Sequence, residues 1–371
     1  MKTRLSTAIL ATLLVASCSR GPSSEPPPIA SPEVQSDGSA IFRVWAPNAK
    51  EVMLALEGAD AAPMTRDSQG IWSIQTKPLE PNFYGYRFLI DGVMFSDPNN
   101  VLIKPDLLRV PSMLHVPGQG LPWEIADVPH GEIHHHFYKS ALIGDQRDYF
   151  VYTPPGYDPA AKTTYPVLYL LHGYTEDARA WTVTGRANVI LDNLIAQGTA
   201  KPMLIVMPLA YGAPEILTRD GRGIEDLVLR QKNYDRFRDE LLSEVIPQIE
   251  KSYRVIKDPS ARAIAGDSMG ATEALYIGLN ALDRFAWIAS FSTGTPGDAS
   301  TFPALDSKAN SQIRLLWIGC GRQDEILESN RKFREWLASK GVTHTDFDSP
   351  GGHTFMVWRR YLAVFASQLF R

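Results

Sequence analysis

The strongest constraint on the fold is a series of wholly apolar segments that alternate with amphipathic segments through the last two thirds of the chain. The apolar runs are "YPVLYLLHG", "KPMLIVMP", "ARAIAG", "FAWIASFS" and "IRLLWIG". Short runs that are apolar at every position are typical of strands buried on both faces of a sheet. Between them lie helical stretches such as "YDRFRDELLSEVIPQIEKSY". This alternation predicts an α/β fold with a mostly parallel, doubly wound sheet over residues 130–371.

The part of the chain before this region has a different period. Residues 39–118 contain the β-rich runs "IFRVWAP", "EVMLAL", "GIWSIQT" and "FYGYRFLIDG", which are separated by turn sequences such as Pro-Asn and Asp-Gly. No helical stretch interrupts them. We therefore expect a small all-β, immunoglobulin-like sandwich, followed by a proline-rich connection to the α/β domain.

The N-terminus has the features of an export signal. Lys2 and Arg4 precede the apolar run "AILATLLVA", which is too short to span a bilayer, and the small residues of "LVASC" resemble a bacterial lipobox. We expect residues 1–18 to be a lipoprotein signal peptide, with Cys18 lipidated and the protein anchored to a bacterial membrane, at the outer membrane or cell surface. The alternative is an ordinary signal peptide.

Two further expectations follow from this N-terminus. Residues 19–38 are rich in proline and serine and predict a semi-rigid tether between the lipid and the folded part. If Cys18 carries the lipid, Cys320 has no partner, so we expect no disulfide despite the export route.

The sequence Gly266-Asp267-Ser268-Met269-Gly270 fits the G-x-S-x-G pattern of a nucleophile elbow. The buried strand "RAIAG" precedes it and the helix "MGATEALYIGLN" follows it, which is the context that the elbow requires. The α/β-hydrolase arrangement is the doubly wound fold that carries such an elbow. Ser268 is therefore predicted to be a nucleophile; the alternative is a serine that only caps the helix.

A serine hydroxyl needs a base and an orienting acid, which in this fold follow in the order Ser, acid, His. His353 follows two glycines and opens the last helix, whereas His344 lies in a predicted strand, so His353 is the expected base. Asp324 stands in the loop after the next-to-last strand and is preferred to Glu325 as the acid. The predicted catalytic residues are Ser268, Asp324 and His353.

The oxyanion hole requires two N–H donors. The backbone N–H of Met269 is one candidate, and the His172-Gly173 pair after the first buried strand nominates the N–H of Tyr174, with His172 itself structural. Three aromatic residues on segments expected near the carboxyl edge of the sheet form either a slot for a phenolic acyl group or sugar, or simply core packing. These residues are Trp181, Tyr211 and Trp358.

Several functional classes are disfavoured. A net charge of −4 provides no basic surface for nucleic acid. The run "IHHHFYKS" invites a metal interpretation, but on a strand His134 and His136 point away from His135 and no further ligand is evident. We expect neither a metal nor another cofactor, because acyl transfer through a serine needs none.

The N-terminal region resembles a known family. "FRVWAPNAKEV", "YGYRFLIDGV" and "DPNN" are similar to the early-set module called carbohydrate-binding module 48. The resemblance implies a polysaccharide-binding or domain-docking role. Four aromatic residues are candidates for stacking on sugar rings, although packing is the preferred interpretation for each. They are Trp45, Trp72, Tyr84 and Tyr86.

The C-terminal region resembles the esterase D-like family and, within it, feruloyl esterases of carbohydrate esterase family 1. The resemblance rests on "IAGDSMGATEAL", "LLWIGCGRQDEI", "GGHTFMVWRRYL" and the region around His172. It implies cleavage of hydroxycinnamoyl or acetyl esters from xylan and places Ser268, Asp324 and His353 on the triad positions. One departure is local: many members read H-G-G or H-G-x-G, where this chain has Tyr174 and Thr175.

The sequence leaves other functions open. Within the same enzyme class the substrate is an acetyl-xylan ester, a siderophore ester or a mycolate-type acyl group, because related hydrolases share the elbow and the triad. In another class the chain is a glycan-binding surface lipoprotein with an inactive esterase scaffold. The expected partner is a feruloylated or acetylated polysaccharide, and the membrane is contacted only through the N-terminal lipid.

Overall fold

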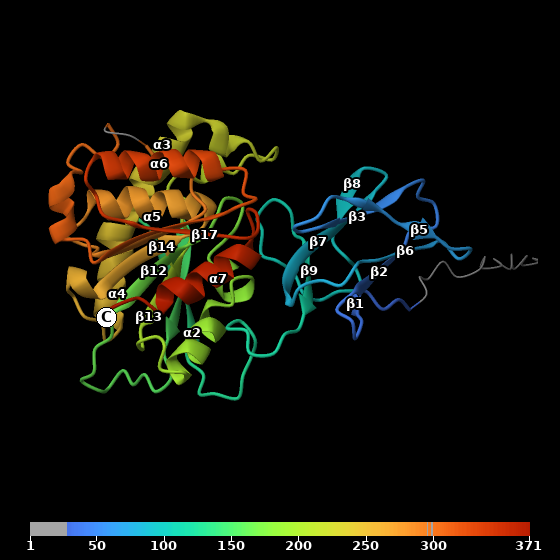
Figure 1. Cartoon of the computed structure of the whole chain (residues 1–371), viewed down its shortest axis with the longest axis horizontal. Helices are drawn as coiled ribbons and strands as arrows, with labels where there is room; N and C mark the ends of the chain where they lie inside the picture. Colours follow the sequence, from blue (N-terminus) through green and yellow to red (C-terminus); the bar gives the residue numbers. More distant parts are fainter. Residues whose placement is uncertain (1–27, 295, 298–299) are drawn as a thin grey trace, which may run out of the picture.

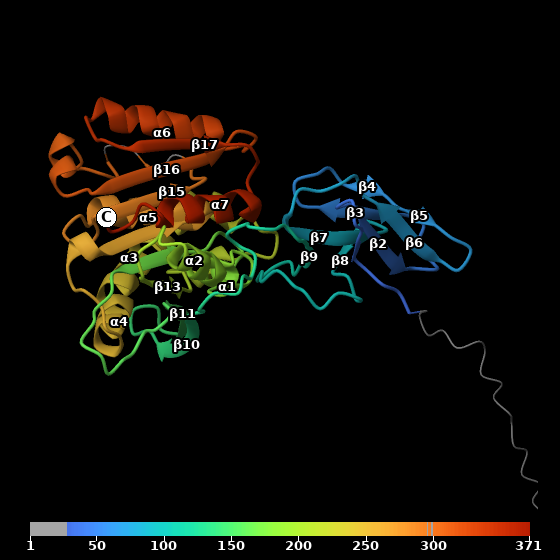
Figure 2. The same cartoon turned by 60° about the horizontal axis from the view of Figure 1, so that its bottom comes forward.

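The computed structural model describes residues 28–294, 296–297 and 300–371. It contains an all-β domain followed by a larger α/β domain (Figure 1). In both views strands β7 and β9 lie on the side of the first domain nearer the second (Figures 1 and 2). Within the described residues no helix is both long and apolar enough to cross a membrane.

The N-terminal domain is a sandwich of two sheets. One has the order β1-β2-β6-β5 and the other β4-β3-β7-β8, with β9 paired to β7. The strands are β1 (Glu33–Val34), β2 (Ala40–Trp45), β3 (Val52–Leu56), β4 (Ala62–Pro63), β5 (Thr65–Arg66), β6 (Ile71–Gln75), β7 (Asn82–Ile90), β8 (Val93–Phe95) and β9 (Ser112–Val116).

Burial alternates along two strands of this sandwich, as the period of two predicts. In β2 and β3 every second residue is buried, and the rings of Phe42 and Phe88 both contact Tyr86 inside the sandwich. Trp72, Tyr84 and Tyr86 are buried in the same core, which confirms the packing interpretation for these three. Trp45 is half-buried and donates its Nε1–H to the carbonyl of Gln69.

The sandwich begins earlier than the expected boundary at residue 39. Strand β1 pairs with β2, and the hydroxyl of Ser31 donates to Asp97 at 2.6 Å. Residues 28–38 therefore belong to the sandwich rather than to the tether, because an edge strand needs the neighbour that β2 provides. The predicted signal peptide, Cys18 and the remainder of the tether lie outside the described residues.

The α/β domain is built on an eight-stranded sheet of order β10-β11-β13-β12-β14-β15-β16-β17. The pairings β10–β11 and β11–β13 are antiparallel and the others parallel. The strands are β10 (Glu132–Lys139), β11 (Gln146–Thr153), β12 (Val167–Leu171), β13 (Leu204–Pro208), β14 (Arg262–Gly266), β15 (Trp287–Phe291), β16 (Leu315–Gly321) and β17 (Thr345–Ser349). The predicted doubly wound sheet is confirmed.

Helices cover both faces of this sheet (Figures 1 and 2). Residues of α2 and α7 pack on one face, and residues of α3, α4, α5 and α6 pack on the other. The helices are α1 (Ala180–Val183), α2 (Ala187–Ala196), α3 (Leu227–Glu240), α4 (Ile246–Ser252), α5 (Ser268–Asn280), α6 (Leu327–Ser339) and α7 (Phe355–Ala366). Strand β12 is buried along its whole length because its side chains alternate between the two layers.

The histidine run lies on β10, at the edge of the sheet. His134 contacts the hydroxyl of Thr153, His135 the carboxylate of Asp148, and His136 the hydroxyl of Tyr253. Among the described residues no group of three or more histidine, cysteine or acidic side chains is arranged to hold a metal ion. Cys320 is a buried free thiol on β16.

Candidate active site

Ser268 lies in a sharp turn between the end of β14 and the start of α5. Its φ angle of 51° is in the left-handed region, which costs a residue with a side chain about 1 to 3 kcal/mol. A Cβ atom on Gly266 would lie 2.5 Å from the carbonyl carbon of Gly270, and one on Gly270 would lie 2.6 Å from the carbonyl oxygen of His172. Glycine is therefore required on both sides of the serine.

The hydroxyl of Ser268 does not serve as a helix cap. The capping position belongs to Asp267, and the Oγ atom of Ser268 lies 2.8 Å from Nε2 of His353. The Nδ1 atom of His353 lies 3.0 Å from Oδ2 and 3.2 Å from Oδ1 of Asp324. An ionised carboxylate only accepts, so Nδ1–H donates to Asp324 and Nε2 is free to accept the serine proton.

Asp324 is held in the loop after β16. It is 6% exposed, and its Oδ1 atom also accepts the N–H of Ile326 at 3.1 Å. Burial raises the pKa of the Asp324 carboxyl, but the hydrogen bond from His353 and the charge of that ring outweigh burial, so the pKa lies below its usual value. The carboxyl is therefore ionised at neutral pH.

The two alternative residues, Glu325 and His344, are not part of the hydrogen-bonded chain described above. Glu325 lines the cavity above Ser268, whereas Asp324 contacts His353. His344 is directed toward the carbonyl of Val342, at the start of β17. The structure thus brings together Ser268, Asp324 and His353.

The two expected oxyanion donors lie beside the serine. Within the described part of the chain, neither the N–H of Tyr174 nor that of Met269 has a backbone or side-chain acceptor. A Cβ atom on Gly173 would lie 3.3 Å from Cβ of Ser268, so the loop that carries Tyr174 approaches the nucleophile closely. Two unoccupied N–H groups next to a nucleophile form a suitable site for a developing negative charge.

His172 supports this loop from below. Its Nε2 atom accepts the N–H of Ala210 at 2.9 Å, so its Nδ1–H donates to the carbonyl of Gly173 at 2.8 Å. Burial lowers the pKa of His172 to about 4. The ring is neutral and fully buried, which agrees with the expected structural role.

Of the two interpretations of the three aromatic residues, the structure supports core packing and not a stacking slot. Trp181 is 1% exposed and donates to the carbonyl of Leu171, while Tyr211 is also 1% exposed and donates to the carbonyl of Glu176 at 3.1 Å. Trp358 is buried and stands edge-on to the ring of His353, with the centroids 5.0 Å apart. All three are part of the buried core, because large apolar rings gain most free energy when they are removed from water.

A cavity of about 550 Å³ opens above Ser268 and His353. Its walls come from the Tyr174 loop, the first half of α3 together with the residue Ile224 before it, and the loop after β15. The lining residues include Ile224, Leu227, Arg230, Gln231, Tyr234, Thr272 and Thr301. None of these seven residues was predicted from the sequence. Ile224 lies in the long connection between β13 and α3, a type of segment that often carries function, but the other residues of this wall that precede α5 lie on α3 itself.

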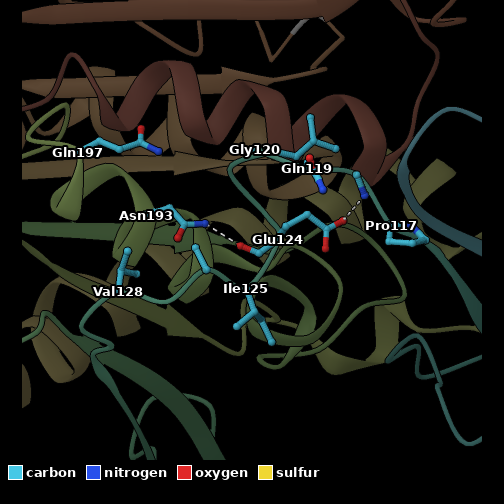
Figure 3. Close-up of a pocket in the computed structure, with 11 residues that line it drawn as sticks. Pro117, Gln119, Gly120, Glu124, Ile125, Val128, Asn193 and Gln197 are labelled. Carbon is cyan, nitrogen blue, oxygen red and sulfur yellow. Dashed lines mark hydrogen bonds between the residues drawn. The ribbon is translucent and has the colours of Figure 1, made fainter.

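A second cavity of about 600 Å³ lies between the connection at residues 117–128 and helix α2 (Figure 3). The amide of Asn193 donates to the carbonyls of Pro122 and Glu124 at its floor. The residues that line this cavity do not include Ser268, Asp324 or His353. The active site is therefore assigned to the cavity above Ser268.

An eight-stranded sheet with a serine elbow and a Ser–His–Asp chain defines the class of the protein as an α/β-hydrolase. Residues 140–368 match the family described as "Putative esterase", and the chain belongs to this esterase family. Residues 30–105 match carbohydrate-binding module 48, described as the isoamylase N-terminal domain. The first match covers the α/β domain from β11 onward, and the second covers the sandwich except β9.

The chain is 34% identical over 349 residues to an endo-1,4-beta-xylanase/feruloyl esterase of Xylanibacter ruminicola, a match that covers 92% of this chain and 46% of that protein. It is 25% identical over 271 residues to an esterase of Mycobacterium tuberculosis, covering 59% of this chain and 55% of the relative. The chain thus spans about half the length of the curated relatives it matches.

Solved structures give a similar result. A ferulic acid esterase of carbohydrate esterase family 1 from Anaeromyces mucronatus superposes with a TM-score of 0.57 at 25% identity, over 67% of this chain and 93% of that one. The enterobactin esterase of Shigella flexneri superposes with a TM-score of 0.65 at 18% identity, over 90% of this chain and 93% of that one. The second likeness concerns the fold alone.

Proposed function

We propose that this chain hydrolyses carboxylic esters by acyl transfer through Ser268. The observation that carries the proposal is the hydrogen-bonded chain from Ser268 Oγ through the ring of His353 to Asp324, at the floor of a cavity. A serine becomes a nucleophile when an oriented imidazole accepts its proton. Each link of that chain is within hydrogen-bonding distance.

The reaction proceeds in two steps. Ser268 Oγ attacks the ester carbonyl while Nε2 of His353 takes its proton, and the oxyanion is held by the N–H groups of Tyr174 and Met269. His353 then returns the proton to the leaving alcohol, and an acyl-enzyme remains. Water, activated by the same ring, hydrolyses it. Asp324 keeps the ring oriented and stabilises its cation.

The proposed substrates are hydroxycinnamoyl esters of plant xylan. The relative from Xylanibacter ruminicola, which matches both domains, is an endo-1,4-beta-xylanase/feruloyl esterase. A cavity of about 550 Å³ falls within the usual range for small-molecule sites and accommodates a phenolic acyl group. The sandwich, as a member of carbohydrate-binding module 48, supports a polysaccharide partner.

An acetyl ester is the second candidate. The chain is 22% identical over 232 residues to an acetyl esterase of Caldicellulosiruptor saccharolyticus. The triad serves any acyl group equally, so the choice depends on the walls of the cavity.

The test is hydrolysis of methyl ferulate, feruloylated arabinoxylan and acetylated xylan by the purified chain, beside Ser268→Ala. Release of ferulate that disappears in the variant supports the proposal. Release of acetate alone would transfer the assignment to an acetyl-xylan esterase. If the parent cleaves none of these esters faster than Ser268→Ala but still binds xylan, the chain is a glycan-binding protein on an esterase scaffold.

Export and lipid anchoring through Cys18 form a separate part of the proposal, supported by the sequence "LVASC". Radiolabelled palmitate should be incorporated by cells that express the full chain and not by cells that express Cys18→Ser. Equal labelling of the two proteins would contradict the anchor and leave the ordinary signal peptide.

A further inference from the structure

A loop of the sandwich contacts the loop that carries the proposed oxyanion donor. Leu107, between β8 and β9, donates its N–H to the carbonyl of Thr175 at 2.6 Å. The hydroxyl of Thr175 donates to Oδ2 of Asp106 at 2.7 Å. The residue after Tyr174 is therefore held by its backbone and its side chain at once, and both contacts come from the other domain.

Thr175 needs this support because of its backbone conformation. Its φ angle is 71°, in the left-handed region, where a β-branched residue is a genuine outlier. Glycine adopts this conformation freely, and a glycine at this place would complete the H-G-x-G pattern that this chain lacks. Threonine here is strained unless surrounding contacts determine its conformation.

The sandwich side of the contact is itself fixed. The Oδ1 atom of Asp106 accepts the N–H groups of Leu108 and Arg109 at 2.8 and 2.6 Å, so its other oxygen is directed toward Thr175. Nearby, Nζ of Lys104 lies 3.5 Å from Glu57, whose second oxygen accepts the N–H of Gly85 on β7. The loop is thus tied to the central strand of its own sheet.

On the hydrolase side several contacts hold this turn, including hydrogen bonds from the hydroxyl of Tyr211 to its carbonyl groups. The Oε2 atom of Glu176 accepts the N–H of Gly173 at 3.0 Å, which closes the turn from residue 173 to residue 176. Within that turn the N–H of Tyr174 has no acceptor among the residues that the structure describes, and the next residue along the chain is Thr175. A donor that is misdirected by a small rotation no longer stabilises the oxyanion.

We propose that the β8–β9 loop of the sandwich is a positioning element of the active site: Asp106 and Leu107 hold Thr175 in the left-handed conformation that directs the N–H of Tyr174 toward the reacting carbonyl. This inference rests on the proposed esterase function. It gives the N-terminal domain a role in the chemical step that is independent of sugar binding.

Three variants of the full chain test it: Asp106→Ala, Thr175→Gly and the double variant. Asp67→Ala is the matched control, because Asp67 also caps a turn of the sandwich, through the N–H groups of Gln69 and Ile71, and it lies in the β5–β6 hairpin. The substrate is p-nitrophenyl acetate, which is too small to need a polysaccharide site.

Asp106→Ala should lower kcat about 10- to 100-fold with KM changed less than about threefold, since loss of one whole oxyanion donor costs about 10²- to 10³-fold. Thr175→Gly provides the reference rate for the double variant. The double variant should recover to within about threefold of Thr175→Gly, because glycine needs no clamp. Asp67→Ala should be unchanged. A double variant as slow as Asp106→Ala, or an Asp106→Ala enzyme as fast as the parent, would overturn the inference.

Hydrogen–deuterium exchange provides a readout that needs no turnover. The peptide that covers residues 171–180 should exchange faster in Asp106→Ala than in the parent, and equally in Asp67→Ala and the parent. If the parent cleaves no ester, the proposed function fails. The comparison of exchange rates then tests by itself whether Asp106 holds the Tyr174 loop in place. Equal exchange in Asp106→Ala and the parent would then reject this positioning.

Discussion

The guanidinium of Arg359, on the last helix, donates a hydrogen bond to Oδ1 of Asn82, the first residue of strand β7. The Arg359 side chain is fully buried, and its Nε–H also donates to the carbonyl of Thr184 at 2.8 Å. Burial lowers the pKa of this guanidinium to about 10, so it still carries its charge at neutral pH. One buried cation therefore joins the sandwich to two segments of the hydrolase domain.

Replacing Arg359 by methionine should lower the free energy of unfolding by about 2 to 4 kcal/mol. The variant removes the donor from the buried carbonyl of Thr184 and leaves Oδ1 of Asn82 with the N–H of Phe83 but without the charged donor. Urea unfolding followed by tryptophan fluorescence measures the change. Arg360→Met is the control, because the neighbouring Arg360 is only half-buried and should cost less than about 1 kcal/mol. Equal losses in the two variants would contradict the assigned role of Arg359.

Asp324→Asn should reduce kcat about 10³- to 10⁴-fold with little change in stability. The amide has the shape of the carboxylate but favours the wrong tautomer of His353 and does not stabilise its cation. Steady-state hydrolysis of methyl ferulate measures the effect. Glu325→Gln, which changes the adjacent carboxylate on the cavity wall, should retain kcat within about threefold. A larger loss in Glu325→Gln than in Asp324→Asn would reverse the assignment.

Trp358→Ala should lower kcat about tenfold for methyl ferulate and p-nitrophenyl acetate alike. The indole stands edge-on against the ring of His353 and keeps it in place, so its removal loosens the base for every substrate. Trp358→Phe should keep most of the activity. A rise in KM for methyl ferulate alone would show instead that Trp358 contacts the acyl group.

Glu273→Gln should stabilise the protein more at pH 8 than at pH 5. Glu273 is fully buried on α5, and burial raises its pKa well above the usual value, although the amide of Asn233 donates to it at 2.8 Å. A folded-state pKa above the unfolded value means that the stability from this group is present below about pH 4.5 and is lost as pH rises toward the folded pKa.

The measurement is the difference between Glu273→Gln and the parent in urea unfolding at each pH. Glutamine still accepts from Asn233 but does not ionise, so the difference should grow in favour of the variant by about 1 to 3 kcal/mol between pH 5 and pH 8. Other groups titrate equally in both proteins and cancel. A difference that does not vary with pH would contradict the raised pKa.

Much of the architecture follows from local pattern. Runs such as "LIVMP" are apolar at every position, and only a strand covered on both faces buries them completely. The elbow was equally readable, because the two glycines around Ser268 are required wherever the chain turns this sharply. Chain order then restricted the acid and the base to a few residues, and the structure brings Asp324 and His353 together with Ser268.

The burial of individual aromatic side chains could not be predicted from the sequence in the same way. Trp181, Tyr211 and Trp358 belong to segments near the site, yet they are part of the buried core. Segment position indicates which edge of the sheet a residue approaches, but the direction of its side chain depends on the neighbours that close around it. The boundary at residue 39 failed for a related reason: β1 is a strand only because β2 lies beside it.

The sequence by itself determined the layers of the protein, the elbow and the small set of residues from which a triad is drawn, since these depend on period, glycine geometry and chain order. Tertiary structure alone decided that Asp106 contacts Thr175 and that Arg359 contacts Asn82. Both contacts join residues that are far apart in the chain and lie in different domains. No local pattern encodes such a pair, because the contact exists only after both domains have folded and packed together.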